Sequence, residues 1–80
     1  MNLNATALQL RAARYALNWS IADLAEVSGV SARTIIRYEA IDGVPPNRAG
    51  NLEKLVKALE DAGIEFTGTP DHRPGIVMKR

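Results

Sequence analysis

Apolar residues recur every three or four positions along most of this chain, which is the period of an amphipathic α-helix. The first such stretch predicts a helix over residues 6–17, with Leu10 and Ala13 on one face. Thr6 and Gln9 stand three positions apart at its start, the spacing of a capping box, in which each side chain bonds to the other residue's backbone N–H. We therefore expect Thr6 to cap this helix.

A second helix is predicted to begin at Ser20. Ser20 and Asp23 repeat the capping-box spacing, and Trp19 before the cap can pack against Leu24 as a hydrophobic staple. Gly29 is expected to end the helix, because glycine adopts a left-handed conformation at little cost. The residues expected to face inward are Leu24, Ala25 and Val27.

A third helix is predicted almost at once, from a cap at Ser31 to about residue 40. Val30 before this cap and Ile35 after it have the same staple spacing as the pair around Ser20. Residues 29–31 then form a turn of three residues between two short helices. This arrangement favours a helix-turn-helix over its alternative, an ordinary helical hairpin in a bundle.

The rest of the chain predicts a loop, a fourth helix and a short β-ribbon. Pro45 and Pro46 exclude helix before them, and Asn47 is expected to cap a helix that runs to about residue 62. Ile64 and Phe66 then alternate with polar residues, which predicts a strand. We expect a turn over residues 70–75 and a second strand from Gly75 to Lys79. The residues that the fourth helix is expected to bury are Leu52, Leu55, Val56 and Leu59.

Two segments are therefore predicted: a helical domain over residues 1–63 and a strand or ribbon extension over residues 64–80. A two-stranded ribbon alone is only marginally stable in water. We expect this extension either to cover the helical core or to pair with a second chain, and a homodimer is the preferred version.

Composition supports one small, mainly α-helical domain. The chain has 80 residues, of which 46% are hydrophobic and only 5% aromatic, and it contains no cysteine. A domain of this size lies near the lower limit for a single core without disulfides or metal. No stretch approaches the roughly 20 apolar residues of a membrane span, and the first residues lack the pattern of a signal peptide. We expect a cytoplasmic protein without membrane contact.

The net charge of +1 favours no class of partner, but the kind of basic residue does. Every basic residue among positions 1–40 is arginine, at Arg11, Arg14, Arg33 and Arg37. The planar guanidinium suits phosphates and guanine edges better than the point charge of lysine, although a solvated helix face would also accommodate it. Nucleic acid is thus a candidate partner.

Enzyme chemistry has little support. His72 is the only histidine and stands in a Pro-flanked loop without a partner group. The acidic pairs at residues 23 and 26 and at residues 60 and 61 are best explained as a cap and as surface charges. We expect no catalytic residue, no metal ligand and no cofactor.

The stretch WSIADLAEVSGVSARTIIRYE, residues 19–39, resembles the Cro/repressor-type, or XRE-like, helix-turn-helix family. The resemblance covers roughly residues 10–59. It implies a four-helix lambda-repressor-like fold, here with a short C-terminal β-ribbon or extended tail. It also implies that double-stranded DNA is the partner and that the helix from Ser31 enters the major groove.

The resemblance further implies which residues meet DNA. Ala32, Arg33 and Arg37 match base-reading positions, and Ile36 lies on the same helix face. Ile36 would suit a thymine methyl group if exposed, whereas burial against the fourth helix is the alternative. The expected phosphate contacts are Ser31, Thr34, Arg14 and the start of the second helix at Ser20.

One family feature is expected and another is missing. Glu39 matches a buried acid that pairs with an arginine of the first helix, and Arg11 is the expected partner in this structural pair. Many members carry glutamine just after the second helix cap, where this chain has Ile21. Backbone N–H groups at that helix start could still bind a phosphate.

Together these features favour a small sequence-specific transcriptional regulator, a repressor that occludes promoter DNA. The alternative is a protein-interaction module, an antitoxin or adaptor that uses the same fold to bind another protein. Loss of affinity with added salt would separate the two, because neutralising phosphates releases counterions.

Overall fold

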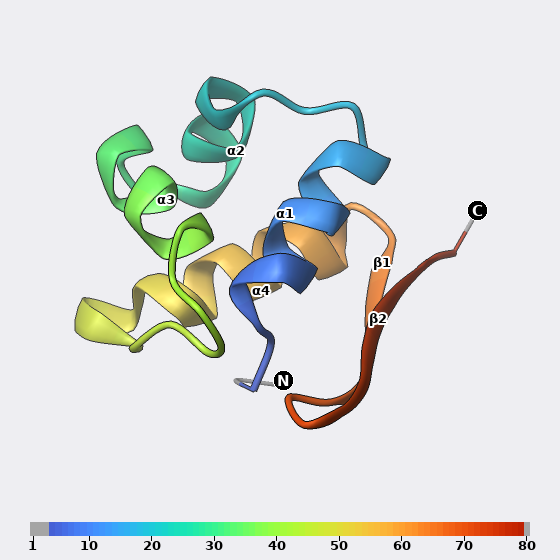
Figure 1. The fold of residues 1–80 in the computed structure, drawn as a ribbon. Helices are drawn as coiled ribbons and strands as arrows, with labels where there is room; N and C mark the ends of the chain where they lie inside the picture. Colours follow the sequence, from blue (N-terminus) through green and yellow to red (C-terminus); the bar gives the residue numbers. More distant parts are fainter. Residues whose placement is uncertain (1–3, 80) are drawn as a thin grey trace.

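Helices and then a β-hairpin follow one another along the chain in the order that the apolar pattern predicts (Figure 1). The computed structural model describes residues 4–79. The helices are α1 (Ala7–Ala16), α2 (Ile21–Ser28), α3 (Ala32–Glu39), the short 3-10 helix η1 (Arg48–Gly50) and α4 (Asn51–Asp61). The strands are β1 (Ile64–Thr69) and β2 (His72–Met78), which pair antiparallel.

The predicted caps of α1 and α2 are confirmed. The Thr6 hydroxyl accepts a hydrogen bond from the Gln9 N–H at 3.1 Å, and the Gln9 side chain accepts one from the Thr6 N–H at 2.8 Å. Ser20 and Asp23 form the same reciprocal pair. These bonds satisfy N–H groups that have no partner within the helix, so each helix begins where its cap stands.

The helix-turn-helix unit is also confirmed. Gly29 ends α2 with φ +78°, the left-handed conformation expected of it, and Ser31 caps α3 through the Thr34 N–H at 3.2 Å. Leu24 is buried and Ala25 half-buried, but the prediction for Val27 is wrong, since its side chain is 54% exposed. The inward stripe of α2 runs through Ile21, Leu24, Ala25 and Ser28, at spacings of three and four, and Val27 lies outside it.

The start of the fourth helix differs from the prediction. The turn η1 comes between Asn47 and α4, with positive φ angles at Ala49 (51°) and Gly50 (73°). Asn47 still acts at this helix start, because its side-chain oxygen accepts a hydrogen bond from the Glu53 N–H at 3.1 Å. The four residues expected inside α4 are all buried: Leu52, Leu55, Val56 and Leu59.

The hairpin is longer and its turn tighter than predicted. Most of the expected turn over residues 70–75 belongs to β2, and only Pro70 and Asp71 lie between the strands. The register shifts between Thr67 and Thr69, and Gly68 there has φ +74°. A side chain at Gly68 would collide with the backbone of Arg73. Glycine thus permits the irregularity that lets the strands continue to such a short turn.

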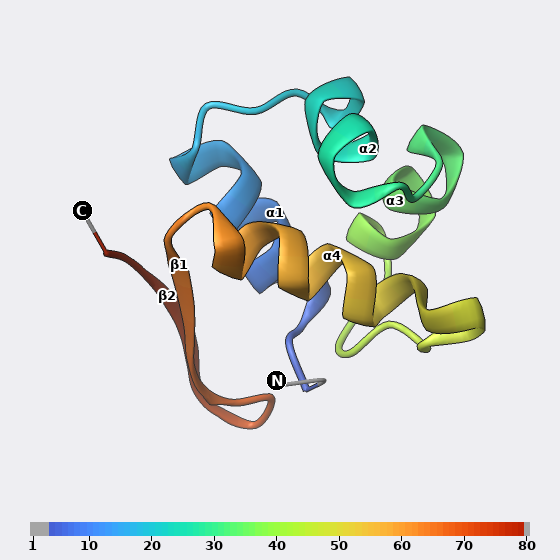
Figure 2. The ribbon, with the colours of Figure 1, turned by 180° about the vertical axis from the view of Figure 1, so that it is seen from behind.

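One core joins the helices and the hairpin. Ile64 and Phe66 of β1 pack in the same buried cluster as Leu10, Leu24 and Leu55. The hairpin lies beside α1 and α4, on the side away from α2 and α3 (Figures 1 and 2). Of the two alternatives for the ribbon, the structure shows the one in which it covers the helical core, whereas the preferred version was pairing in a homodimer.

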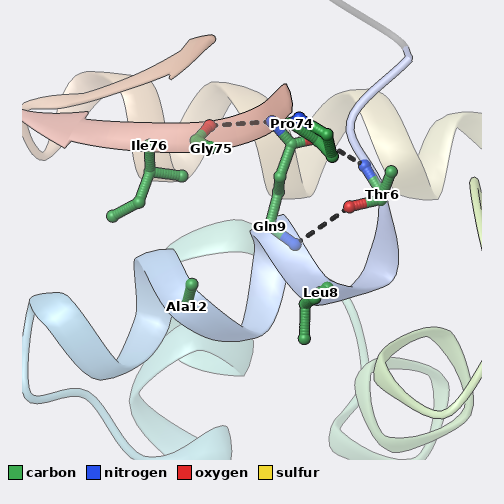
Figure 3. Close-up of a pocket in the computed structure, with 7 residues that line it drawn as sticks. All are labelled: Thr6, Leu8, Gln9, Ala12, Pro74, Gly75 and Ile76. Carbon is green, nitrogen blue, oxygen red and sulfur yellow. Dashed lines mark hydrogen bonds between the residues drawn. The ribbon is translucent and has the colours of Figure 1, made fainter. Parts of the chain in front are cut away.

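Gln9 holds the hairpin to α1. Its buried side-chain amide donates to the carbonyl oxygens of Thr67 at 3.0 Å and Gly75 at 2.8 Å, one on each strand. Thr67 and Gly75 are paired across the hairpin. Figure 3 shows this amide at the end of a hollow between α1 and β2, lined in part by Leu8, Ala12 and Ile76.

Candidate nucleic-acid interface

The outer face of α3 carries the side chains predicted to read bases. Ile35, Tyr38 and Glu39 are buried and fix one side of this helix against the core. The opposite side leaves four side chains exposed, namely Ala32, Arg33, Ile36 and Arg37. The structure thus brings the proposed reading residues together on one solvent-facing surface, which we call the α3 face.

The alternative in which Ile36 packs against the fourth helix does not hold. Its side chain is 58% exposed and borders a shallow hollow with Tyr15 of α1 and Ile21 of α2. Ile35, its neighbour, is fully buried. This difference follows from the helical period, because adjacent residues point about 100° apart.

Glu39 pairs with Arg14, so the prediction of an Arg11–Glu39 pair is wrong. Arg14 Nε lies 2.7 Å from Glu39 Oε2, and Arg14 Nη2 lies 2.8 Å from Glu39 Oε1. Arg14 follows the buried Leu10 by one helical turn, so it lies beside the apolar stripe of α1. Arg11 directly follows Leu10, so its side chain points about 100° away from that of Leu10, and it is only half-buried.

The expected role of Arg14 as a phosphate contact is also wrong. Its side chain is buried to 6% exposure, and Nη1 donates to the Trp19 carbonyl oxygen at 3.0 Å. The hydrogen bond with Glu39 raises the pKa of the Arg14 guanidinium, against the opposing effect of burial. The guanidinium also stacks over the Tyr15 ring, with its carbon 4.6 Å from the ring centroid. Arg14 therefore ties α1, the α1–α2 loop and α3 together.

The hydroxyl groups expected near phosphates are engaged locally. Ser20 Oγ accepts from the Asp23 N–H, and Ser31 Oγ donates to Thr34 Oγ1 at 3.0 Å. Ser20 and Ser31 are exposed and Thr34 is half-buried. Their side chains act first as helix caps, and any phosphate contact at these positions would add to that role.

Arg48 was missed by the sequence reasoning. Its backbone N–H donates to the Tyr38 hydroxyl at 3.4 Å, which places the loop after α3 against the side of that helix. Arg48 and Arg37 border one hollow of about 240 Å³, together with Thr34 and Asn51. Two guanidinium groups therefore flank the edge of the α3 face. The only sequence signal was a basic residue at the start of the fourth helix.

Other chemistry finds no comparable arrangement. His72 is exposed on β2 rather than in a loop. Among residues 4–79, no group of three or more potential metal-ligating side chains is gathered. No helix in the part of the chain that the structure describes is long and apolar enough to cross a membrane.

Comparison with known proteins agrees with this architecture. Residues 10–60 match the family described as helix-turn-helix, a span that runs from within α1 to the last turn of α4 and includes the whole α3 face. No curated protein matches the chain. The matched span covers more than half of the 80 residues, and the chain belongs to the Cro/repressor-type, XRE-like helix-turn-helix family of DNA-binding regulators.

Proposed function

We propose that this protein is a sequence-specific transcriptional repressor that places α3 in the major groove and blocks access to promoter DNA. The observation that carries the proposal is the α3 face, where Arg33 and Arg37 stand one helical turn apart on the exposed side of a short, well-anchored helix. An α-helix fits the major groove of B-DNA, where each base pair presents a distinct pattern of donors and acceptors.

The two exposed arginines differ from Arg14 in their freedom to bind. Among residues 4–79, no carboxylate lies within ion-pair distance of Arg33 or Arg37. Each fork of N–H donors is therefore available to a ligand. Guanine offers two acceptors, O6 and N7, that match this fork. We expect at least one guanine in each half-site.

Arg48 supplies the sequence-independent part of the proposed interface. It lies at the margin of the α3 face rather than on it, beside the hollow that it shares with Arg37. A guanidinium in this position suits the DNA backbone, which carries charge but no sequence information. The start of α2 offers a second backbone contact through its free N–H groups.

A homodimer completes the proposal. One short recognition helix reads only a few base pairs, and two-fold pairing doubles the length of the site. Because the hairpin lies on the side of the molecule away from α3, pairing through it would set the two α3 helices at the outer ends of the dimer.

The test is to select bound sequences from a random DNA pool and to compare three alanine variants. Arg33→Ala and Arg37→Ala should each cost about 1–3 kcal/mol on the selected site and relax the preference at one position. Arg48→Ala should weaken selected and random DNA by the same factor and reduce the salt dependence. Equal losses on both DNAs for Arg33→Ala and Arg37→Ala would contradict base reading. A protein-interaction module would select no sequence at all.

A further inference from the structure

Ile36 on the α3 face and the apolar side chains next to it have no role in the proposed arginine contacts. One shallow hollow of about 260 Å³ is bordered by Ile36 of α3, Ala40 just after α3, Tyr15 of α1 and Ile21 of α2. Tyr15, Ile36 and Ala40 are exposed, and Ile21 is half-buried. We call this set the Ile36 hollow. An apolar surface next to two free arginines needs its own explanation.

The Ile36 hollow is poorly suited to a phosphate. The ionic groups that line it include Arg14 and Glu39, which satisfy each other through two hydrogen bonds of 2.7 and 2.8 Å. Arg14 gives its remaining guanidinium nitrogen to the Trp19 carbonyl. Arg11 alone adds a further positive charge at the border of the hollow. Apart from Arg11 and the Tyr15 hydroxyl, the remaining border side chains are aliphatic and offer a phosphate no donor.

The position of Ile36 on α3 points to a base. Ile36 follows Arg33 by three residues and Ala32 by four, so the three side chains are neighbours on the helix surface. Whatever base edge Arg33 meets, Ile36 faces the adjoining part of the same groove. In the major groove only one unmodified base presents an apolar group, the C5-methyl of thymine.

We infer that Ile36, backed by Ile21, reads the C5-methyl group of a thymine next to the base pair contacted by Arg33. This inference rests on the proposed function, since it requires α3 to lie in the major groove. It assigns the specificity of the site to two kinds of contact, a donor fork for guanine and an apolar surface for thymine. The isoleucine at position 21, where many family members carry glutamine, becomes part of the reading surface.

The experiment removes one methyl group at a time from the DNA. In the sequence selected from a random pool, each thymine is replaced singly by deoxyuridine, which lacks only the C5-methyl. For the unaltered protein we expect one position in each half-site at which affinity falls about four-fold, the value of one buried methyl-sized group. Ile36→Ala should bind thymine and deoxyuridine equally at that position.

Val27→Ala is the matched control, because Val27 is an exposed aliphatic side chain on α2 that does not border the hollow. This variant should keep the deoxyuridine effect unchanged. Two results would overturn the inference while leaving base reading by the arginines intact: no thymine sensitive to methyl removal, or a sensitive thymine whose effect persists in Ile36→Ala. Failure to select any sequence would instead reject the proposed function and this inference with it.

Discussion

Arg11 and Arg14 lie less than one helical turn apart on α1, yet their environments differ completely. Arg14 makes two hydrogen bonds to Glu39 and one to the Trp19 carbonyl, all inside the protein. Arg11 is half-buried at the border of two hollows. A buried ion pair is weak evidence for stability, but removing one partner leaves the other charge without compensation.

Single substitutions of the buried pair should therefore be costly. We expect Arg14→Ala or Glu39→Ala to lower the free energy of unfolding by about 3–5 kcal/mol, because each leaves a buried charge unpaired. Chemical denaturation followed by circular dichroism measures this loss. Arg11→Ala is the matched control and should change stability by less than about 0.5 kcal/mol, as surface substitutions usually do. A larger loss for Arg11→Ala than for Arg14→Ala would contradict this assignment.

At this scale the sequence identified Glu39 but not its partner. The acid was recognisable because it stands at a position of the recognition helix where the family carries a buried acid. Which arginine of α1 pairs with Glu39 depends on how α1 is rotated about its axis relative to α3. Arg11 and Arg14 are less than one helical turn apart, and the sequence alone does not fix that rotation. Leu10 and Ala13 marked the buried stripe, but an arginine beside that stripe is equally compatible with solvent exposure, since its long stem can reach water.

At the scale of the elements, a single side chain, that of Gln9, bonds to both strands of the hairpin. The Gln9 amide uses its oxygen to cap α1 at Thr6 and its two hydrogens to hold Thr67 and Gly75. Both strands are thus tied to the same helix terminus. The capping role was predictable from the spacing of Thr6 and Gln9. The two carbonyl contacts were not, because they join residues 58 and 66 positions apart in the chain.

Gln9→Met should loosen the attachment of the hairpin to α1 without leaving a cavity at position 9. The thioether is of similar size but cannot donate, so two carbonyl groups and the Thr6 N–H lose a partner, at a cost of about 1–3 kcal/mol. Hydrogen exchange should accelerate in β1 and β2 more than in α3. Glu26→Gln, at an exposed position of α2 that does not border the hollow beneath the hairpin, is the control and should leave hairpin exchange unchanged. Equal acceleration throughout the molecule would mean that Gln9 supports the whole fold rather than the hairpin.

For the whole molecule, the helical pattern predicted the fold class and the order of elements, but not how the tail joins the core. The alternation of Ile64 and Phe66 with polar residues predicted a strand with one apolar face. The neighbouring residues in the sequence do not indicate what covers that face. In the structure the partner is the helical core itself. A small domain buries only a modest fraction of its surface on folding, so the apolar face of the hairpin is a needed part of its core.

Removing the tail should consequently destabilise the helices. A chain of residues 1–63 loses Ile64 and Phe66 from the core, each worth about 1.5–3 kcal/mol when fully buried. With a total stability of about 5–15 kcal/mol for such domains, we expect a strongly lowered melting temperature by circular dichroism. Val77→Ala, on the outward-facing side of β2, should melt close to the full chain. Unchanged melting of the truncated chain would show that the hairpin is dispensable.

The proposed dimer makes a separate demand on the hairpin. Its inward residues serve the core, so a second chain can meet only its outer face and strand edges, where Val77 is the exposed large apolar side chain. We expect two chains to bind one selected site, which sedimentation of the complex with DNA would measure.

Val77→Lys should weaken binding to paired half-sites while leaving binding to a single half-site unchanged, because the lysine does not touch α3. A full-length chain that stays monomeric on paired half-sites would exclude the dimer and confine recognition to the few base pairs beneath one helix.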